Sequence, residues 1–159
     1  MIQFLEVRVA HSSDDAEEAL GSGSVKLTSS DLELGNTGNT GSTAQMVGLR
    51  FLGIDIPTGA TITNAYLQFQ TDEIGSVASN VVFRGEDTGN AARFASASHN
   101  VSGRADTDAS VAWSPAAWTQ VGATSTEQRT PDLSAIIQEI VNRPDWAANN
   151  ALVLTATGS

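Results

Sequence analysis

The chain has 159 residues, of which 40% are hydrophobic and 16% charged, and it contains no cysteine. This length suits one domain with a substantial core, and the composition argues against a disordered chain, a coiled coil and a disulfide-stapled fold. The net charge of −10, with Lys26 as the only lysine, argues against nucleic acid as a partner, because phosphate backbones attract clustered basic residues.

Short apolar and β-branched runs, separated by stretches rich in Gly, Ser, Thr and Asn, predict an all-β chain. The strands are expected at residues 4–9, 25–34, 46–54, 61–70, 77–83, 110–113 and 151–157. The acidic, Ser-rich segment 11–18 is expected to be a loop. In segment 61–70, Ala65, Leu67 and Phe69 alternate with mostly polar residues, so this face should point into the core. No apolar run approaches the roughly 18 residues that span a bilayer, so we expect no membrane insertion.

One helix is predicted late in the chain. Thr130 is expected to be its N-cap, Pro131 fits the first helical position, Asp132 meets the positive end of the dipole, and Pro144 ends the helix. Its apolar stripe consists of Leu133, Ile136, Ile137, Ile140 and Val141. The element order predicts an antiparallel β-sandwich with one short helix near the C-terminus, which covers residues 1–159 as a single module.

Two segments carry a resemblance to a known family. The run VGLRF at 47–51, followed by IPTGATITNAYLQF at 56–69, resembles the central strands of DNRLRE-type jelly-roll domains, the group that includes carbohydrate-binding module family 96. Trp118-Thr119, then the predicted helix and the strand that follows it, are similar to the late part of the same domains. Together these segments cover about half of the chain.

The resemblance implies a jelly roll from a larger secreted or cell-surface bacterial protein, with extracellular placement, bound calcium and contact with polysaccharide or cell-surface glycan. Such domains continue past the position of Gly158 and Ser159 into a further loop and a last strand. We therefore expect an open strand position in this chain. An exposed strand edge favours self-association or a strand donated by another chain.

Carboxylates in three segments are the candidate calcium ligands. Calcium binds hard oxygen atoms in flexible geometry, and pairs such as Asp31 and Glu33 would share one face of a strand. The predicted ligands are Asp14, Asp15, Glu17, Asp31, Glu33 and Asp72. A solvated acidic surface is the alternative, because the sequence has no Asp-x-Asp-x-Asp-Gly loop.

Tyr66 and Trp118 are the candidates for stacking on sugar rings, whereas Trp113 and Trp146 are expected in the core. Burial is the alternative for Trp118 as well. The two histidines lie in separate polar segments, and no catalytic motif is present, so we predict that the chain is not an enzyme.

Two functions remain open from the sequence. The first is a non-catalytic, calcium-binding extracellular module that contacts polysaccharide, and the second is a structural or adhesive module that assembles by strand complementation. An exposed row of aromatic side chains would favour the first, and a strand from another chain beside segment 4–9 or 151–157 would favour the second.

Overall fold

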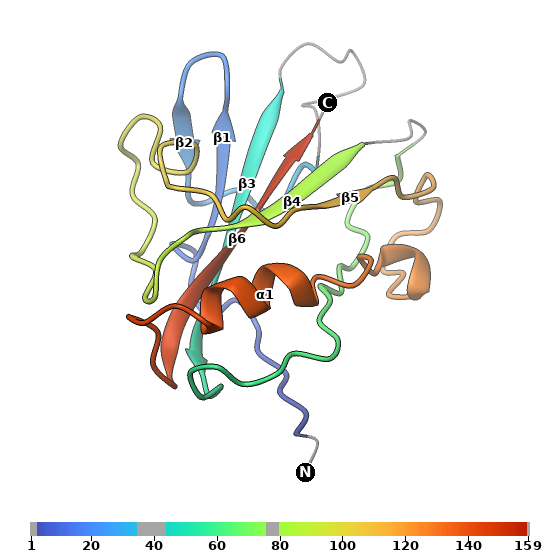
Figure 1. Cartoon of the computed structure of the whole chain (residues 1–159). Helices are drawn as coiled ribbons and strands as arrows, with labels where there is room; N and C mark the ends of the chain where they lie inside the picture. Colours follow the sequence, from blue (N-terminus) through green and yellow to red (C-terminus); the bar gives the residue numbers. More distant parts are fainter. Residues whose placement is uncertain (1–2, 35–43, 76–79, 159) are drawn as a thin grey trace.

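The computed structural model describes residues 3–34, 44–75 and 80–158, and they form one antiparallel sheet with a single α-helix (Figure 1). The predicted all-β class is confirmed. The strands are β1 (Asp15–Ala19), β2 (Ser24–Lys26), β3 (Gln45–Ile54), β4 (Val81–Gly85), β5 (Val111–Trp113) and β6 (Asn150–Gly158). A 3-10 turn, η1 (Thr126–Gln128), precedes the helix α1 (Ser134–Val141). The strand order is β2-β1-β3-β6-β4-β5.

The two longest strands, β3 and β6, pair at the centre of the sheet. Their register places Leu49 opposite Leu154 and Phe51 opposite Leu152. Side chains of alternate residues point to opposite faces of a strand, so these four project from one face. Both strands are apolar along most of their length because both faces of the sheet are covered.

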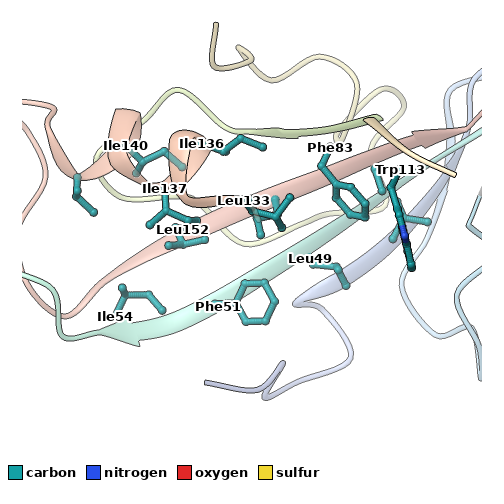
Figure 2. Close-up of a cluster of buried hydrophobic side chains, with 14 of the residues drawn as sticks. Leu49, Phe51, Ile54, Phe83, Trp113, Leu133, Ile136, Ile137, Ile140 and Leu152 are labelled. Carbon is teal, nitrogen blue, oxygen red and sulfur yellow. The ribbon is translucent and has the colours of Figure 1, made fainter. Parts of the chain in front are cut away.

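The first face of the sheet packs against α1. Figure 2 shows the buried helix side chains turned toward the side chains of the strands. The helix approaches β4 at Gly85, where a Cβ atom would lie 2.7 Å from Ile140 Cδ1 and 2.9 Å from Ile136 Cγ2. A glycine is therefore needed at this point for the helix to pack on the sheet.

The second face is covered by the irregular segment 86–108. Its Phe94 and Val101 side chains pack against Gly48, where a Cβ atom would lie 2.5 Å from Phe94. A buried ion pair between Arg50 and Asp14, with an N–O distance of 2.7 Å, ties β3 to the residue that precedes β1. The same guanidinium donates to the carbonyl of Ala91, which attaches segment 86–108 to the sheet.

A second sheet is not formed by the described residues, so the predicted sandwich is incomplete. Segments 4–9, 25–34 and 61–70 were expected to be strands, but only the start of the second is one, in β2. Val7, Val9, Leu32 and Leu34 pack against the core on the first face, whereas Leu27 packs on the second. Segment 61–70 has one isolated bridge, between Gln68 and Arg129. Its side-chain pattern identified the inward face correctly, since Ala65, Leu67 and Phe69 pack against the core.

Two further predictions were wrong in detail. Segment 11–18 was expected to be a loop, but Asp15–Ala19 forms β1, because the Glu17 and Glu18 carboxylates find buried hydrogen-bond partners. The helix begins at Ser134 because the Thr130 hydroxyl accepts a hydrogen bond from Leu67 N instead of capping the helix. Residues 77–79 of the predicted strand 77–83 lie outside the described residues. The described part of the chain contains no helix with the length and apolar character of a membrane span.

Candidate functional site

A long groove lies on the first face of the sheet, beside α1. At its floor are the buried apolar side chains of Leu49, Phe51, Leu152 and Leu154, which are at most 9% exposed, and its walls include segments 3–9 and 60–75. The groove has a volume of about 2350 Å³, whereas small-molecule pockets have about 300–1,000 Å³. It is therefore large enough for a segment of polymer.

One edge of segment 61–70 is hydrogen-bonded to the chain that leads into α1. Ala65 N donates to Asp132 Oδ1 at 2.9 Å, and Leu67 N donates to Thr130 Oγ1 at 3.0 Å. Thr130 N in turn donates to the Leu67 carbonyl at 3.0 Å. These bonds hold the odd-numbered residues of the segment to one side.

The other edge of the segment is open. In an extended chain the backbone groups of successive residues point to opposite edges. The N–H and C=O groups of Asn64, Tyr66, Gln68 and Gln70 have no hydrogen-bond partner within the described part of the chain. The backbone of segment 4–9, on another wall of the groove, likewise has none among the residues that the structure describes. The groove thus combines an apolar floor with unpaired backbone edges.

An acidic cluster borders the groove where segment 29–34 lies over β1. Glu33 N donates to Glu17 Oε1 at 2.7 Å, and Gln45 Nε2 donates to Glu33 Oε2 at 3.2 Å. Glu17 and Gln45 are 4% and 5% exposed, and the Gln45 Oε1 atom is buried without a hydrogen-bond partner in the described structure. Three oxygen-bearing side chains therefore meet in a largely buried position.

Negative charge is crowded in this cluster. Burial raises the pKa of the Glu33 carboxyl, and the neighbouring Glu17 and Asp31 carboxylates add to that rise. Burial also raises the pKa of Asp15 against an opposing backbone hydrogen bond, and the neighbouring Asp14 and Glu17 carboxylates add to the rise. A bound cation would relieve this repulsion.

Four of the six predicted calcium ligands are neighbours in pairs: Glu33 lies near Glu17 and Asp31, and Asp15 lies near Glu17. Asp14 is engaged by Arg50, and among the described residues the exposed Asp72 forms no hydrogen bond or ion pair with the cluster. The described residues contain no group of three or more His, Asp or Glu side chains placed to hold one metal ion.

Gln45 was missed by the sequence reasoning. Its position at the start of a strand gives no local signal of a long-range contact with Glu33. Glu73, which follows the predicted ligand Asp72 directly in the sequence, is a further neighbour of Glu33.

The two predicted sugar-stacking residues do not form one platform. Trp118 packs with Phe69 and Trp113, at ring-centroid distances of 6.3 and 6.2 Å, and so belongs to the edge of the core. Tyr66 is 40% exposed, and the Arg129 guanidinium covers its ring at 4.3 Å. Tyr66 and Phe69 are three residues apart in an extended segment, so Tyr66 and Trp118 lie on opposite sides of it.

Glu18 is a further buried carboxylate that the prediction left without a role. It accepts hydrogen bonds from Val101 N at 2.8 Å and Ser102 N at 3.0 Å, and from the Ser102 hydroxyl. The His99 ring lies 3.5 Å from the same carboxylate and is largely exposed. The Ser102 hydroxyl also lies 3.3 Å from His99 Nδ1. In a Ser–His–acid triad the hydroxyl and the acid contact different ring nitrogens, whereas here both Ser102 and Glu18 lie beside Nδ1 and Ser102 donates to Glu18, so these contacts anchor segment 96–104 to β1.

Comparisons with protein-family models, with curated proteins and with solved structures found no match. The resemblance to DNRLRE-type domains therefore remains an expectation from residues 47–69 and 118–154. The groove, its open edges and the acidic cluster are the observations on which a function can be proposed.

Proposed function

We propose that this chain is a non-catalytic structural or adhesive module that accepts an extended segment of another polypeptide as an additional β-strand. The observation behind this proposal is the groove, whose apolar lining lies beside an edge of segment 61–70 with no hydrogen-bond partner in the described part of the chain. Unpaired strand edges are templates for pairing with another chain. Placement outside the cell is part of the proposal and rests on the family resemblance.

A strand is the ligand that satisfies both features of the groove. Its backbone would pair with the N–H and C=O groups of Tyr66 and Gln68 that have no partner within the described chain, while alternate side chains would cover half-buried apolar side chains of the lining such as Val7 and Ile62. Each inward apolar side chain would contribute about 1.5–3 kcal/mol on burial. Three such side chains would offset a large part of the free-energy cost of losing translational and rotational freedom on association, which is about 4–15 kcal/mol.

The test uses proline at a position whose N–H is free. Gln68→Pro removes an N–H group that has no partner within the described chain, so the fold should tolerate it, whereas strand pairing should not. Gln68→Ala is the matched control, because it loses the same side chain and keeps the N–H.

The ligand for this test is a peptide of about nine alternating valine and threonine residues, the length that segment 63–71 can pair with. Titration calorimetry should show binding to the parent and to Gln68→Ala, and at least tenfold weaker binding to Gln68→Pro. Equal affinities of the two variants would contradict pairing at this edge.

The second candidate function is a calcium-binding module that contacts polysaccharide or cell-surface glycan. It is favoured by the oxygens of the buried Glu17 and Gln45 and of the half-buried Glu33, of which Gln45 Oε1, without a hydrogen-bond partner among the described residues, fits a cation best. Calcium takes 6–8 oxygens, so backbone carbonyls or water would have to complete the shell. A bound ion would supply positive charge that cross-links segment 29–34 to β1.

Calcium and glycan binding are separable by experiment. Glu33→Gln should abolish calcium-dependent thermal stabilisation, whereas Asp106→Asn, an exposed change outside the groove, should leave it intact. For glycan contact, Trp118→Ala and Tyr66→Ala should each be compared with the parent on a glycan array. Unchanged binding in both variants would remove these residues as sugar contacts.

A further inference from the structure

We infer that the strand taken up by the groove is a basic segment of a different polypeptide, with alternating apolar residues and with lysine or arginine near its ends. This inference rests on the proposed strand-accepting function and adds the chemistry of the partner. It is based on the charges that line the groove and on those of the chain itself.

The groove is lined by many more carboxylates than basic groups. Besides Glu6, which is paired with Arg8 at 3.3 Å, its acidic lining residues are Asp15, Asp31, Glu33, Asp55, Asp72 and Glu73. The two basic lining residues are Arg8 and Arg129. Arg129 is occupied by the Tyr66 ring and by Gln68 Oε1, to which its Nε donates at 3.1 Å.

The carboxylates lie along the walls, whereas the floor is apolar. The exposed Asp72 and Glu73 follow segment 61–70 directly, and the exposed Asp55 lines the groove before the turn that leads into the segment, so negative charge lies on both sides of the segment in the chain. A strand paired with this edge would place its ends beside these carboxylates. Basic residues at those ends would be attracted, and acidic residues would be repelled.

The same charges disfavour a second copy of this chain as the occupant. The chain has a formal net charge of −10, and Lys26 is its only lysine. Docking one copy into the acidic groove of another would add repulsion between two strongly negative molecules. A different polypeptide with a basic strand has no such penalty.

The experiment compares two peptides on the whole 159-residue chain. Both contain about nine alternating valine and threonine residues, and one is flanked by lysines and the other by glutamates. Affinities are measured by titration calorimetry in chelator, so that divalent cations do not neutralise the acidic cluster. The salt concentration is varied between about 0.1 M and about 1 M, over which the Debye length falls from about 10 Å to about 3 Å.

We expect the lysine-flanked peptide to bind at least tenfold more tightly at low salt, with the difference falling below about threefold at high salt. Asp72→Asn/Glu73→Gln should reduce the preference for lysine. The control Asp106→Asn/Asp108→Asn removes two exposed charges outside the groove and should leave the preference unchanged. Circular dichroism checks that each variant is folded.

Every other outcome overturns the inference in a distinguishable way. Equal affinity for both peptides, or preference for glutamate, would reject a basic partner while leaving strand acceptance intact. Binding of neither peptide, together with dimers in sedimentation, would make a second copy the occupant. Binding of neither peptide to a monomer would reject both the partner and the proposed function.

Discussion

Two adjacent isoleucines on α1 provide a test of which part of the core is closed and which part borders the groove. Ile136 is 0% exposed and packs against Gly85, whereas Ile137 is 7% exposed and lines the groove. Figure 2 shows Ile137 pointing from α1 toward Leu152 on β6. Truncation of each to alanine removes the same atoms from two different environments.

The expected losses of stability differ because a closed site retains a cavity. Ile→Ala in a well-packed core costs about 2–5 kcal/mol, and the cost increases with the cavity left behind. Ile136→Ala should fall near the upper end, at about 4 kcal/mol, since the helix and β4 leave little room to collapse. Ile137→Ala should cost about 2 kcal/mol, because water in the groove can replace the removed atoms.

Chemical and thermal denaturation, both followed by tryptophan fluorescence, measure the loss of unfolding free energy and of melting temperature in the two variants. Ala135→Ser, on the exposed face of α1, is the control. At about 2–4 °C per kcal/mol for a domain of this size, Ile136→Ala should lower the melting temperature by roughly 8–16 °C and Ile137→Ala by roughly half as much. Equal losses, or a larger loss at Ile137, would show that the groove beside α1 is closed and the reasoning is wrong.

Three further predictions concern the buried carboxylates. Glu18→Gln should cost about 2–3 kcal/mol through weakened charge-assisted hydrogen bonds and should speed proteolysis of segment 96–104, whereas the exposed change Glu6→Gln should do neither. Burial alone would raise the pKa of Glu18, but the hydrogen bonds from Ser102 and Val101 lower it below its ordinary value of 4.5. The contribution of Glu18 to the stability of the folded chain is therefore present above pH 4.5 and is lost as the pH falls through the lowered pKa. Glu33 makes stability depend on pH in the opposite direction. Because its pKa is raised, its contribution to stability is full below pH 4.5 and is lost as the pH rises through the raised pKa. Denaturation of Glu33→Gln across this pH range should not show that loss. Calcium at about a hundredfold excess over its dissociation constant should add about 2.7 kcal/mol of stability that chelator removes, and an unchanged melting curve would count against the cation site.

The parts of the fold that follow local pattern could be predicted from the sequence. The apolar residues of α1 recur with the helical period of 3.6 residues, and the central strands β3 and β6 are almost continuously apolar. Both patterns depend little on distant contacts. Segment 61–70 shows where such reasoning ends. Alternation at Ala65 and Leu67 identifies the buried face, but it cannot show which backbone edge is paired or with what.

The errors have a common physical origin in long-range hydrogen bonds. Asp15–Ala19 was expected to be a loop because carboxylates are usually solvated, yet Glu18 is satisfied by two backbone N–H groups more than eighty positions away along the chain. Thr130 has the local features of a helix cap, but Leu67 N takes its hydroxyl. Local propensity was overridden in both places by tertiary partners.

The candidate site was predictable in composition but not in geometry. Carboxylates such as Glu17 and Glu33 stand out in the sequence, and the structure brings them together. The contact of Glu33 with Gln45 depends on the register between strands, which the sequence does not display. The same register places Asp14 on the other face of the sheet, where it pairs with Arg50.

Amide hydrogen exchange along segment 61–70 tests the open edge most directly. In the free chain, the amides of Tyr66 and Gln68 should exchange quickly and those of Leu67 and Phe69 slowly, because within the described chain Leu67 N and Phe69 N have hydrogen-bond partners whereas Tyr66 N and Gln68 N have none. Adding the lysine-flanked peptide should slow Tyr66 and Gln68 to rates comparable with their odd-numbered neighbours. Protection of Tyr66 and Gln68 in the free chain, or no change on saturation with the peptide, would contradict strand acceptance at this groove.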